Sequence, residues 1–308
     1  MRLKYNTQPA YLRYEPRVLV DPPLQLNGSI LNSYINNVTF AQAIHIFQPK
    51  TFLDFGCYLG GLPLMVEDLL ELAHSDRQLQ TQWYLFDNFS FLKEIERINH
   101  DYDHWINSKD ASLRSWRHHV YHLRNENSRG VLKELPIPAD PQTLKDFLTS
   151  LAAIFNAPYP NIKSITDDLT AINEIKFDMI LFDLDAGATC YPTNRQRLTD
   201  LVQHNLADGG IIALDDVASV HEGQLLLFLD AVNEMGLGLV AVAGDKVFLQ
   251  KTSWHASKQD RNAWLEEIYR SRAWTKNITG EDFFFYLFSD LGQYGHVLKM
   301  LPNKTHLR

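Results

Sequence analysis

Short apolar runs alternate with helix-like segments through the middle of the chain. Runs that are apolar almost throughout are typical of strands buried on both faces of a parallel sheet. Seven such runs occur, at 51–55, 83–86, 162–165, 177–182, 211–214, 238–242 and 246–249. Helical spacing of apolar residues is found at 32–47, 62–73, 141–155, 195–206 and 222–235. The alternation predicts an α/β fold with a doubly wound, mostly parallel, seven-stranded sheet over about residues 50–250.

Three segments lie outside this alternation. Residues 1–49 are expected to form an N-terminal arm, irregular and proline-rich over 1–30, followed by the first helix. The stretch at about 90–160 is far longer than an ordinary connection between strands, so we expect a helical insertion there. Residues 251–308, rich in aromatic side chains, are expected to form a helical C-terminal extension.

The charge of the chain is acidic and unevenly distributed. The 308 residues carry a formal net charge of −8. Residues 146–250 hold fifteen acidic and five basic side chains, a net of −10, so the remainder carries +2. Binding to nucleic-acid phosphates needs a basic surface, so no nucleic-acid partner is expected. The acidic stretch is explained either by a solvated surface or by carboxylates gathered around a cation.

Nothing in the sequence predicts a membrane or an oxidising compartment. The N-terminus lacks the apolar core of a signal peptide, and no window holds about eighteen apolar residues without a charge. The two cysteines, Cys57 and Cys190, are too few for a disulfide framework. We therefore expect a cytoplasmic protein without a membrane partner.

Glycine is sparse in this chain and clustered where it occurs. Of fifteen glycines, Gly56, Gly60 and Gly61 fall in one turn after the first predicted strand. The spacing GxxxGG differs from the dinucleotide fingerprint GxGxxG, because Tyr58 stands where a pyrophosphate must approach the backbone. Asp54, two positions before the first glycine, suits a phosphate-free ligand with an amino-acid end, and S-adenosylmethionine is that ligand. A tight turn without a ligand is the alternative.

Acidic residues also follow the second and third predicted strands. Asp87, with Asn88 beside it, comes where a carboxylate can accept both hydroxyls of a ribose. Asp167 and Asp168 come where an adenine amino group could be held, although capping of a helix explains an aspartate there equally well. Together with the glycine turn, these residues predict a nucleoside-binding edge of the sheet.

Four carboxylates follow the next two strands. Asp183 and Asp185 end one strand, and Asp215 and Asp216 end the next, which a glycine turn at 209–210 precedes. If these strands are neighbours, unpaired like charges crowd one small volume, which is costly. A hard divalent cation with oxygen ligands, usually Mg²⁺, relieves the repulsion. The alternatives are capping, pairing with basic residues distant in the chain, or protonation of one carboxylate.

These motifs resemble those of the class I S-adenosylmethionine-dependent methyltransferases. The series is LDFGCYLGG at 53–61, WYLFDNF at 83–89, LFDLDAG at 181–187 and LADGGIIALDD at 206–216. Within that class it is similar to the cation-dependent O-methyltransferases, most of all the macrocin O-methyltransferase family, and also the catechol and caffeoyl-CoA type. The resemblance covers about residues 50–250 and implies a Rossmann-like methyltransferase fold.

The resemblance implies roles for individual residues. Asp183, Asp215 and Asp216 match metal ligands, and Asp185 matches the second acid of the D-G-D motif, a candidate general base in the macrocin-type enzymes. Two departures concern this site. Ala186 stands where the catechol-type enzymes have a lysine base, and the 32-residue interval from Asp183 to Asp215 is several residues longer than usual.

A second candidate base is His221, which follows the fourth motif closely enough to lie at the mouth of the site. The residues expected to bind S-adenosylmethionine are Asp54, Gly56, Tyr58, Gly60, Gly61, Asp87, Asn88, Asp167, Asp168 and Asp183.

The expected activity is S-adenosylmethionine-dependent methyl transfer to a hydroxyl of a small metabolite, as in secondary metabolism. A Mg²⁺ ion is expected to hold the acceptor oxygen and lower its pKa. The alternatives are a metal-independent methyltransferase, in which the acidic cluster is structural, and a catalytically degenerate nucleotide-fold protein for binding or assembly. An NAD-dependent dehydrogenase is disfavoured by the glycine spacing. The expected partner is the small hydroxylated substrate, and homo-oligomerisation is left open.

Overall fold

The computed structural model describes residues 34–73, 81–90, 138–155, 157–184, 189–217, 222–243, 246–251 and 299–300. The α-helices are α1 (Tyr34–Phe47), α2 (Gly61–Ala73), α6 (Pro141–Phe155), α7 (Tyr191–Asp200) and α8 (Glu222–Asn233), with a 3₁₀ turn η4 (Leu169–Ile172) and a π turn η5 (Leu201–Asn205). The strands are β1 (Thr51–Phe55), β2 (Gln82–Phe86), β3 (Ile162–Thr166), β4 (Phe177–Phe182), β5 (Leu206–Leu214), β6 (Leu237–Ala243), β7 (Lys246–Lys251) and β8 (Lys299–Met300).

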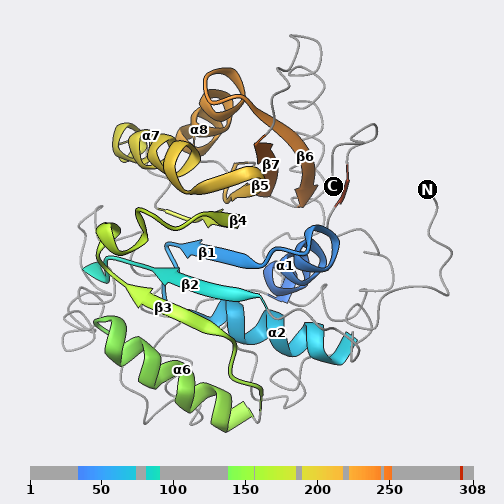
Figure 1. Ribbon diagram of the computed structural model, residues 1–308, viewed down its shortest axis with the longest axis vertical. Coiled ribbons are helices and arrows are strands. Elements are labelled where there is room, and N and C mark those ends of the chain that lie inside the picture. The colour runs from blue at the N-terminus through green and yellow to red at the C-terminus, as the bar shows by residue number, and fades with distance from the viewer. Residues whose placement is uncertain are drawn as a thin grey trace, which may run out of the picture.

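The strands form one sheet in the order β3-β2-β1-β4-β5-β7-β6-β8. Strands β1 to β5 pair in parallel, whereas β7 runs antiparallel to both β5 and β6. The order reverses at β1, since β2 and β3 lie on one side of it and β4 and β5 on the other (Figure 1). The doubly wound, mostly parallel sheet is thus confirmed. The two-residue β8 adds an eighth strand at the β6 edge.

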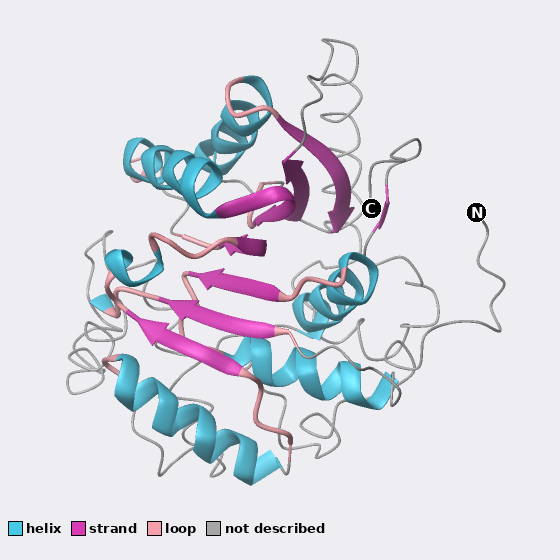
Figure 2. Ribbon diagram, in the orientation of Figure 1, coloured by secondary structure: helices cyan, strands magenta, loops and turns pink. Residues whose placement is uncertain are grey.

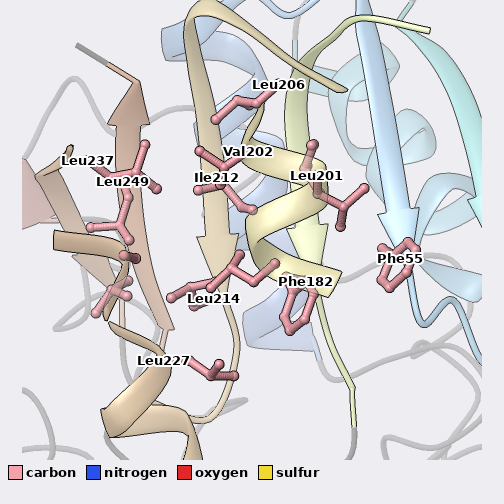
Figure 3. Packing of buried hydrophobic residues seen from close by; sticks show 14 of the residues in the cluster. Phe55, Phe182, Leu201, Val202, Leu206, Ile212, Leu214, Leu227, Leu237 and Leu249 are labelled. Atoms are coloured by element: carbon pink, nitrogen blue, oxygen red, sulfur yellow. The ribbon is translucent and has the colours of Figure 1, made fainter. Parts of the chain in front are cut away.

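Apolar side chains cover both faces of the sheet. On one face, α7, η5 and α8 pack over residues such as Phe55, Phe182 and Leu214 (Figure 3). On the other face, α1 and α2 pack over Phe52 and Met179. Figure 2 shows the helices flanking the strands, with α7 and α8 next to each other. Because alternate residues of a strand point to opposite faces, two covered faces require the continuous apolar runs seen in the sequence.

All seven predicted strands form, and the largest difference in bounds is at β5. The ladder with β4 pairs Leu206 with Phe177 and then Ile211 with Met179, with a shift of register between them. The glycines at 209–210 therefore lie in a bulge inside β5 rather than in a turn before it. A bulge of this kind leaves residues unpaired without ending the strand. Two glycines in the sequence do not by themselves distinguish such a bulge from a turn.

The helix predicted at 195–206 is shifted toward the N-terminus and changes character at its end. It begins at Tyr191, with a proline in its first turn, where proline is favoured because the missing N–H has no helical partner. Its last turn widens into η5, and the Asn205 amide donates to the carbonyls of Ile172 and Ile175 at 2.6 and 3.1 Å. No helix within the described ranges is long and apolar enough to cross a membrane.

A buried hydrogen bond ties α2 to β2. The indole Nε1 of Trp83, which is fully buried, donates to Oε1 of Glu67 at 2.8 Å. The Trp83 ring also stacks on Phe52 of β1, with ring centroids 4.4 Å apart. The carboxylate therefore satisfies an indole N–H that water cannot reach.

We expect Glu67→Ala to lower the free energy of unfolding by about 1–3 kcal/mol, because it leaves the Trp83 N–H buried without this acceptor. Glu67→Gln keeps an acceptor oxygen and should lose much less. Urea denaturation followed by tryptophan fluorescence measures both. Glu71→Ala, at an exposed position one turn later on α2, is the matched control. Equal losses for Glu67→Ala and Glu71→Ala would contradict the role given to this bond.

Candidate functional site

The carboxyl ends of β1 and β4 meet where the strand order of the sheet reverses. In open α/β sheets, ligands bind in the crevice beyond the carboxyl ends of the strands at this point. Here the backbone N–H of Asp183 donates to the carbonyl of Phe55 at 3.0 Å, and that of Asp215 donates to Phe182 at 3.2 Å. The residues that follow β1, β4 and β5 therefore leave the sheet side by side. We call this the acidic edge; its carboxylates are Asp54, Asp87, Asp183 and Asp215.

The turn after β1 is held by its own backbone geometry. The N–H groups of Gly56 and Cys57 both donate to the carbonyl of Phe86, at 2.9 and 3.0 Å. Gly56 has φ +97°, and a Cβ on it would lie 1.8 Å from the carbonyl oxygen of Asp183. Glycine is required at 56 because the backbones of β1 and β4 approach too closely there for any side chain.

The rest of the predicted glycine turn packs against α6. Gly60 has φ +65°, and a Cβ there would meet Leu148 and Leu144 at 3.1 and 3.3 Å. Gly61 is buried and begins α2. Tyr58 also has positive φ, at 51°. The spacing GxxxGG thus serves a turn that faces α6 on one side and the end of β2 on the other.

Asp87 fastens this turn to the end of β2. Its Oδ2 accepts the N–H of Tyr58 at 2.9 Å, and its Oδ1 accepts the N–H of Phe89 at 2.9 Å. Burial raises the pKa of Asp87, while these backbone bonds oppose the rise. A carboxylate offers about four lone pairs, so Asp87 keeps acceptor capacity for hydroxyl donors. Asn88 is exposed, and its Oδ1 accepts from Ser90.

The two aspartates after β3, Asp167 and Asp168, are both exposed. Asp168 caps η4, since its carboxylate accepts the N–H of Thr170 at 2.8 Å and the Thr170 hydroxyl at 2.6 Å. These bonds, led by the one from the hydroxyl, lower the pKa of the exposed Asp168. Of the two interpretations of Asp168, the structure shows the cap.

Strand alternation directs four charged side chains of the acidic edge to one face. Phe52, Leu181, Ala213 and Phe248 all lie in the layer under α1 and α2. The residues two positions from them along each strand, Asp54, Asp183, Asp215 and Lys246, therefore point to that same face.

The acidic edge contains a buried ion pair. Lys246 Nζ lies 2.6 Å from Oδ1 of Asp215, and the two residues are only 3% and 6% exposed. The same Oδ1 accepts the N–H of Asp216 at 2.7 Å. Asp216 itself is partly buried and has φ +58°. Asp215 is thus bonded to a cation supplied by the chain.

Two other carboxyl groups of the acidic edge, those of Asp54 and Asp183, have raised pKa values. Burial, followed by the charges of Asp87 and Asp215, raises the pKa of Asp54 to about 7. Burial and the neighbouring Asp215 raise the pKa of Asp183 well above its usual value, and Lys246 opposes that rise. Burial and the nearby acids also raise the pKa of the Cys57 thiol, so Cys57 is not a thiolate nucleophile.

The predicted magnesium site is not supported by these residues. The structure brings Asp183 and Asp215 to adjacent strand ends, as expected, but Oδ1 of Asp215 already bonds Lys246 and the N–H of Asp216. Within the described ranges, no group of three or more His, Cys, Asp and Glu side chains is arranged to hold a metal ion. For Asp215 the structure shows one of the alternatives weighed from the sequence, pairing with a basic residue distant in the chain, since Lys246 is 31 positions away.

The two candidate bases, Asp185 and His221, lie outside the described residues, as does Ala186. Their proposed roles stay predictions. A residue that sequence reasoning missed is Gln224, which is 1% exposed and whose Nε2 donates to the carbonyl of Leu184 at 3.0 Å. This hydrogen bond connects α8 to the backbone just after β4. Lys246 was also missed, although a lysine that opens an apolar strand at the acidic edge was a signal to consider.

Comparisons with known proteins concern the fold. No family model matches the chain, and no curated protein sequence matches it. Solved structures with a similar arrangement include the O-methyltransferase NovP, 14% identical, over 73% of this chain and 83% of that one, with a TM-score of 0.44. The O-methyltransferase TomG from Streptomyces achromogenes, in complex with SAM, is 10% identical, over 73% and 82%, with a TM-score of 0.37. The SAH-bound methyltransferase PaMTH1 from Podospora anserina is 11% identical, over 80% and 87%, with a TM-score of 0.39. At such identities and TM-scores the likeness is one of fold alone.

We expect Gly56→Ala to destabilise the protein by about 3 kcal/mol or more, because the new Cβ would collide with the Asp183 carbonyl. Gly209→Ala is the matched control: its φ is +75°, but nothing lies within 4 Å of the added Cβ, so it should cost only about 1 kcal/mol. Thermal unfolding of both variants measures the difference. Similar losses would mean that backbone conformation alone, and not the close approach of β1 and β4, requires the glycine.

We expect Asp54→Asn to stabilise the protein more at about pH 8 than at about pH 5. The pKa of Asp54 is higher in the folded protein than in the unfolded chain. At pH values between these two pKa values, the folded protein therefore binds one more proton than the unfolded chain. The free energy of unfolding then falls as pH rises toward about 7. The variant escapes this loss, which is on the order of 2–4 kcal/mol. Melting temperatures at both pH values test this, with Asp208→Asn, at a fully exposed side chain, as control. A pH-independent difference would refute it.

Proposed function

We propose that this protein transfers a methyl group from S-adenosylmethionine to a hydroxyl of a small molecule. The observation that carries the proposal is the acidic edge, where carboxyl groups end β1, β2, β4 and β5 at the point where strand order reverses. This is the place in an open α/β sheet at which ligands bind, and its charge restricts which ligand fits.

The charge of the acidic edge discriminates between nucleoside ligands. S-adenosylmethionine carries a positive sulfonium and an ammonium group, whereas a dinucleotide carries two negative phosphates. Attraction and repulsion both strengthen where water is excluded, so carboxylates at this edge favour the cationic ligand. The turn after β1 supports the same choice, because Tyr58 stands at the position that a pyrophosphate would need to approach.

The groups that would hold the cofactor fit its chemistry. Asp87 is partly buried, is fixed by two backbone N–H bonds and retains lone pairs for a ribose diol. Asp54 and Asp183 are acids with raised pKa values, which a nearby cation would ionise. When bound, S-adenosylmethionine supplies a methyl group activated by its positive sulfur.

The chain's own residues have two further tasks, which are to orient the acceptor oxygen and to take its proton. We assign proton transfer to Asp185, which the D-G-D resemblance favours, with His221 as the second candidate. Both follow strands that end at the acidic edge, β4 and β5. The acceptor is proposed to be a small hydroxylated metabolite.

Isothermal titration of the full chain tests the cofactor. We expect S-adenosylhomocysteine to bind at micromolar concentrations, on the order of 1–100 μM, and NAD not to bind. Asp87→Ala should weaken binding at least about tenfold, because a ribose acceptor and the anchor of the turn are both lost. Asp168→Ala, at the η4 cap, is the matched control and should change affinity little.

Transfer of labelled methyl groups from S-adenosylmethionine to a panel of phenols and sugar alcohols then tests the reaction. Absence of S-adenosylhomocysteine binding by a folded protein would overturn the proposal. Equal losses for the Asp87 and Asp168 variants would remove the acidic edge from cofactor binding.

A further inference from the structure

Lys246 reaches the acidic edge because β7 runs antiparallel to β5. The ladder pairs Leu214 with Val247, so Lys246, the first residue of β7, lies beside Asp215 just beyond the last pair. Alternation along β7 sends its side chain to the same face as Asp54, Asp183 and Asp215. A shift of the β5–β7 register by one residue would send this ammonium to the opposite face.

The contact between Lys246 and Asp215 uses the carboxylate oxygen fully. Oδ1 of Asp215 accepts from Lys246 Nζ at 2.6 Å and from the N–H of Asp216 at 2.7 Å, which is the acceptor capacity of one carboxylate oxygen. Both charged side chains are almost completely buried. A buried carboxylate needs such a partner, because an isolated charge is strongly unfavourable away from water.

A divalent cation and this ammonium would compete for one carboxylate. Mg²⁺ binds a carboxylate oxygen at about 2.0–2.1 Å and demands near-octahedral geometry. Lys246 Nζ lies 2.6 Å from Oδ1 of Asp215. A Mg²⁺ ion bound to the same carboxylate would therefore lie only a few ångströms from the lysine ammonium, in a region that contains little water. Repulsion between the ammonium and the ion opposes binding of both to Asp215 at once. The lysine is part of the chain, whereas the ion would have to bind from solution.

We propose that Lys246 is the permanent counter-ion of the acidic edge, in the place that the motif resemblance gives to a divalent cation, so that methyl transfer by this protein needs no such ion. The second clause rests on the proposed function; the counter-ion role does not. Lys246 is thus a positioning residue, which neutralises and orients Asp215.

Direct cation binding tests the proposal without a methyl acceptor. The full chain is titrated with Mn²⁺, and the free ion is followed by its paramagnetic resonance signal. We expect no saturable site tighter than about 1 mM, with or without S-adenosylhomocysteine. One Mn²⁺ bound per chain, and lost in Asp215→Asn, overturns the proposal.

Replacing Lys246 tests directly whether it is the counter-ion of Asp215. Lys246→Met should lower the melting temperature by roughly 5–10 °C, because Asp215 remains buried without its cation. Asp215→Asn in the same chain should restore most of the loss. Excess Mn²⁺ should raise the melting temperature of Lys246→Met but not that of the wild type. An unchanged melting temperature in Lys246→Met contradicts the counter-ion role.

Lys251→Met is the matched control. Lys251 also lies on β7, but its Nζ donates to the carbonyls of Val202 and Leu206, at 3.0 and 3.1 Å. It should lose stability without gaining any response to Mn²⁺, and an equal response in both lysine variants counts against the proposal. If Lys246→Met does not fold, the Mn²⁺ titration of the wild type and Asp215→Asn decides alone.

Titration with S-adenosylhomocysteine on the same samples separates the two proposals. No binding of S-adenosylhomocysteine together with no Mn²⁺ site refutes the proposed function and leaves the counter-ion role standing. Binding of S-adenosylhomocysteine together with a Mn²⁺ site lost in Asp215→Asn does the reverse.

Discussion

Burying a carboxylate requires a cation or hydrogen-bond donors beside it, and the site of this protein is arranged around that requirement. Three of the four acids of the edge meet it in different ways. Asp215 bonds the ammonium of Lys246, Asp87 accepts two backbone N–H groups, and Asp54 holds its proton up to about pH 7. These three solutions let the sheet place several acids in one small region while the protein stays folded.

Sheet topology supplies the place where the acids gather. Because the strand order reverses at β1, the exits of β1 and β4 lie next to each other, close enough that only glycine fits at position 56. The turn after β1 is then fastened to the end of β2 through Asp87 and backed by leucines of α6. The geometry of the site is therefore a consequence of strand order and close backbone approach, before any ligand is considered.

Much of this was predictable from local pattern. Runs such as 177–182, in which five of the six positions are apolar, are expected to be buried on both faces, and this predicts a parallel sheet with helices on both sides. Aspartates directly after such runs must come to the carboxyl edge. Prediction from the sequence was weaker where tertiary contacts decide the structure. The sequence allowed two interpretations of Asp168 equally, and only the structure shows that it caps η4. The bulge at 209–210 depends on how β5 pairs with β4.

By itself, the sequence determined the fold class, the order of the strands along the chain and the acids that end them, because these follow from periodicity and chain connectivity. Only the tertiary structure decided how the acids are neutralised. Lys246 and Asp215 are 31 residues apart, and nothing in their local sequences links them. They meet because β7 packs antiparallel against β5 in one register, and register is a property of the assembled sheet.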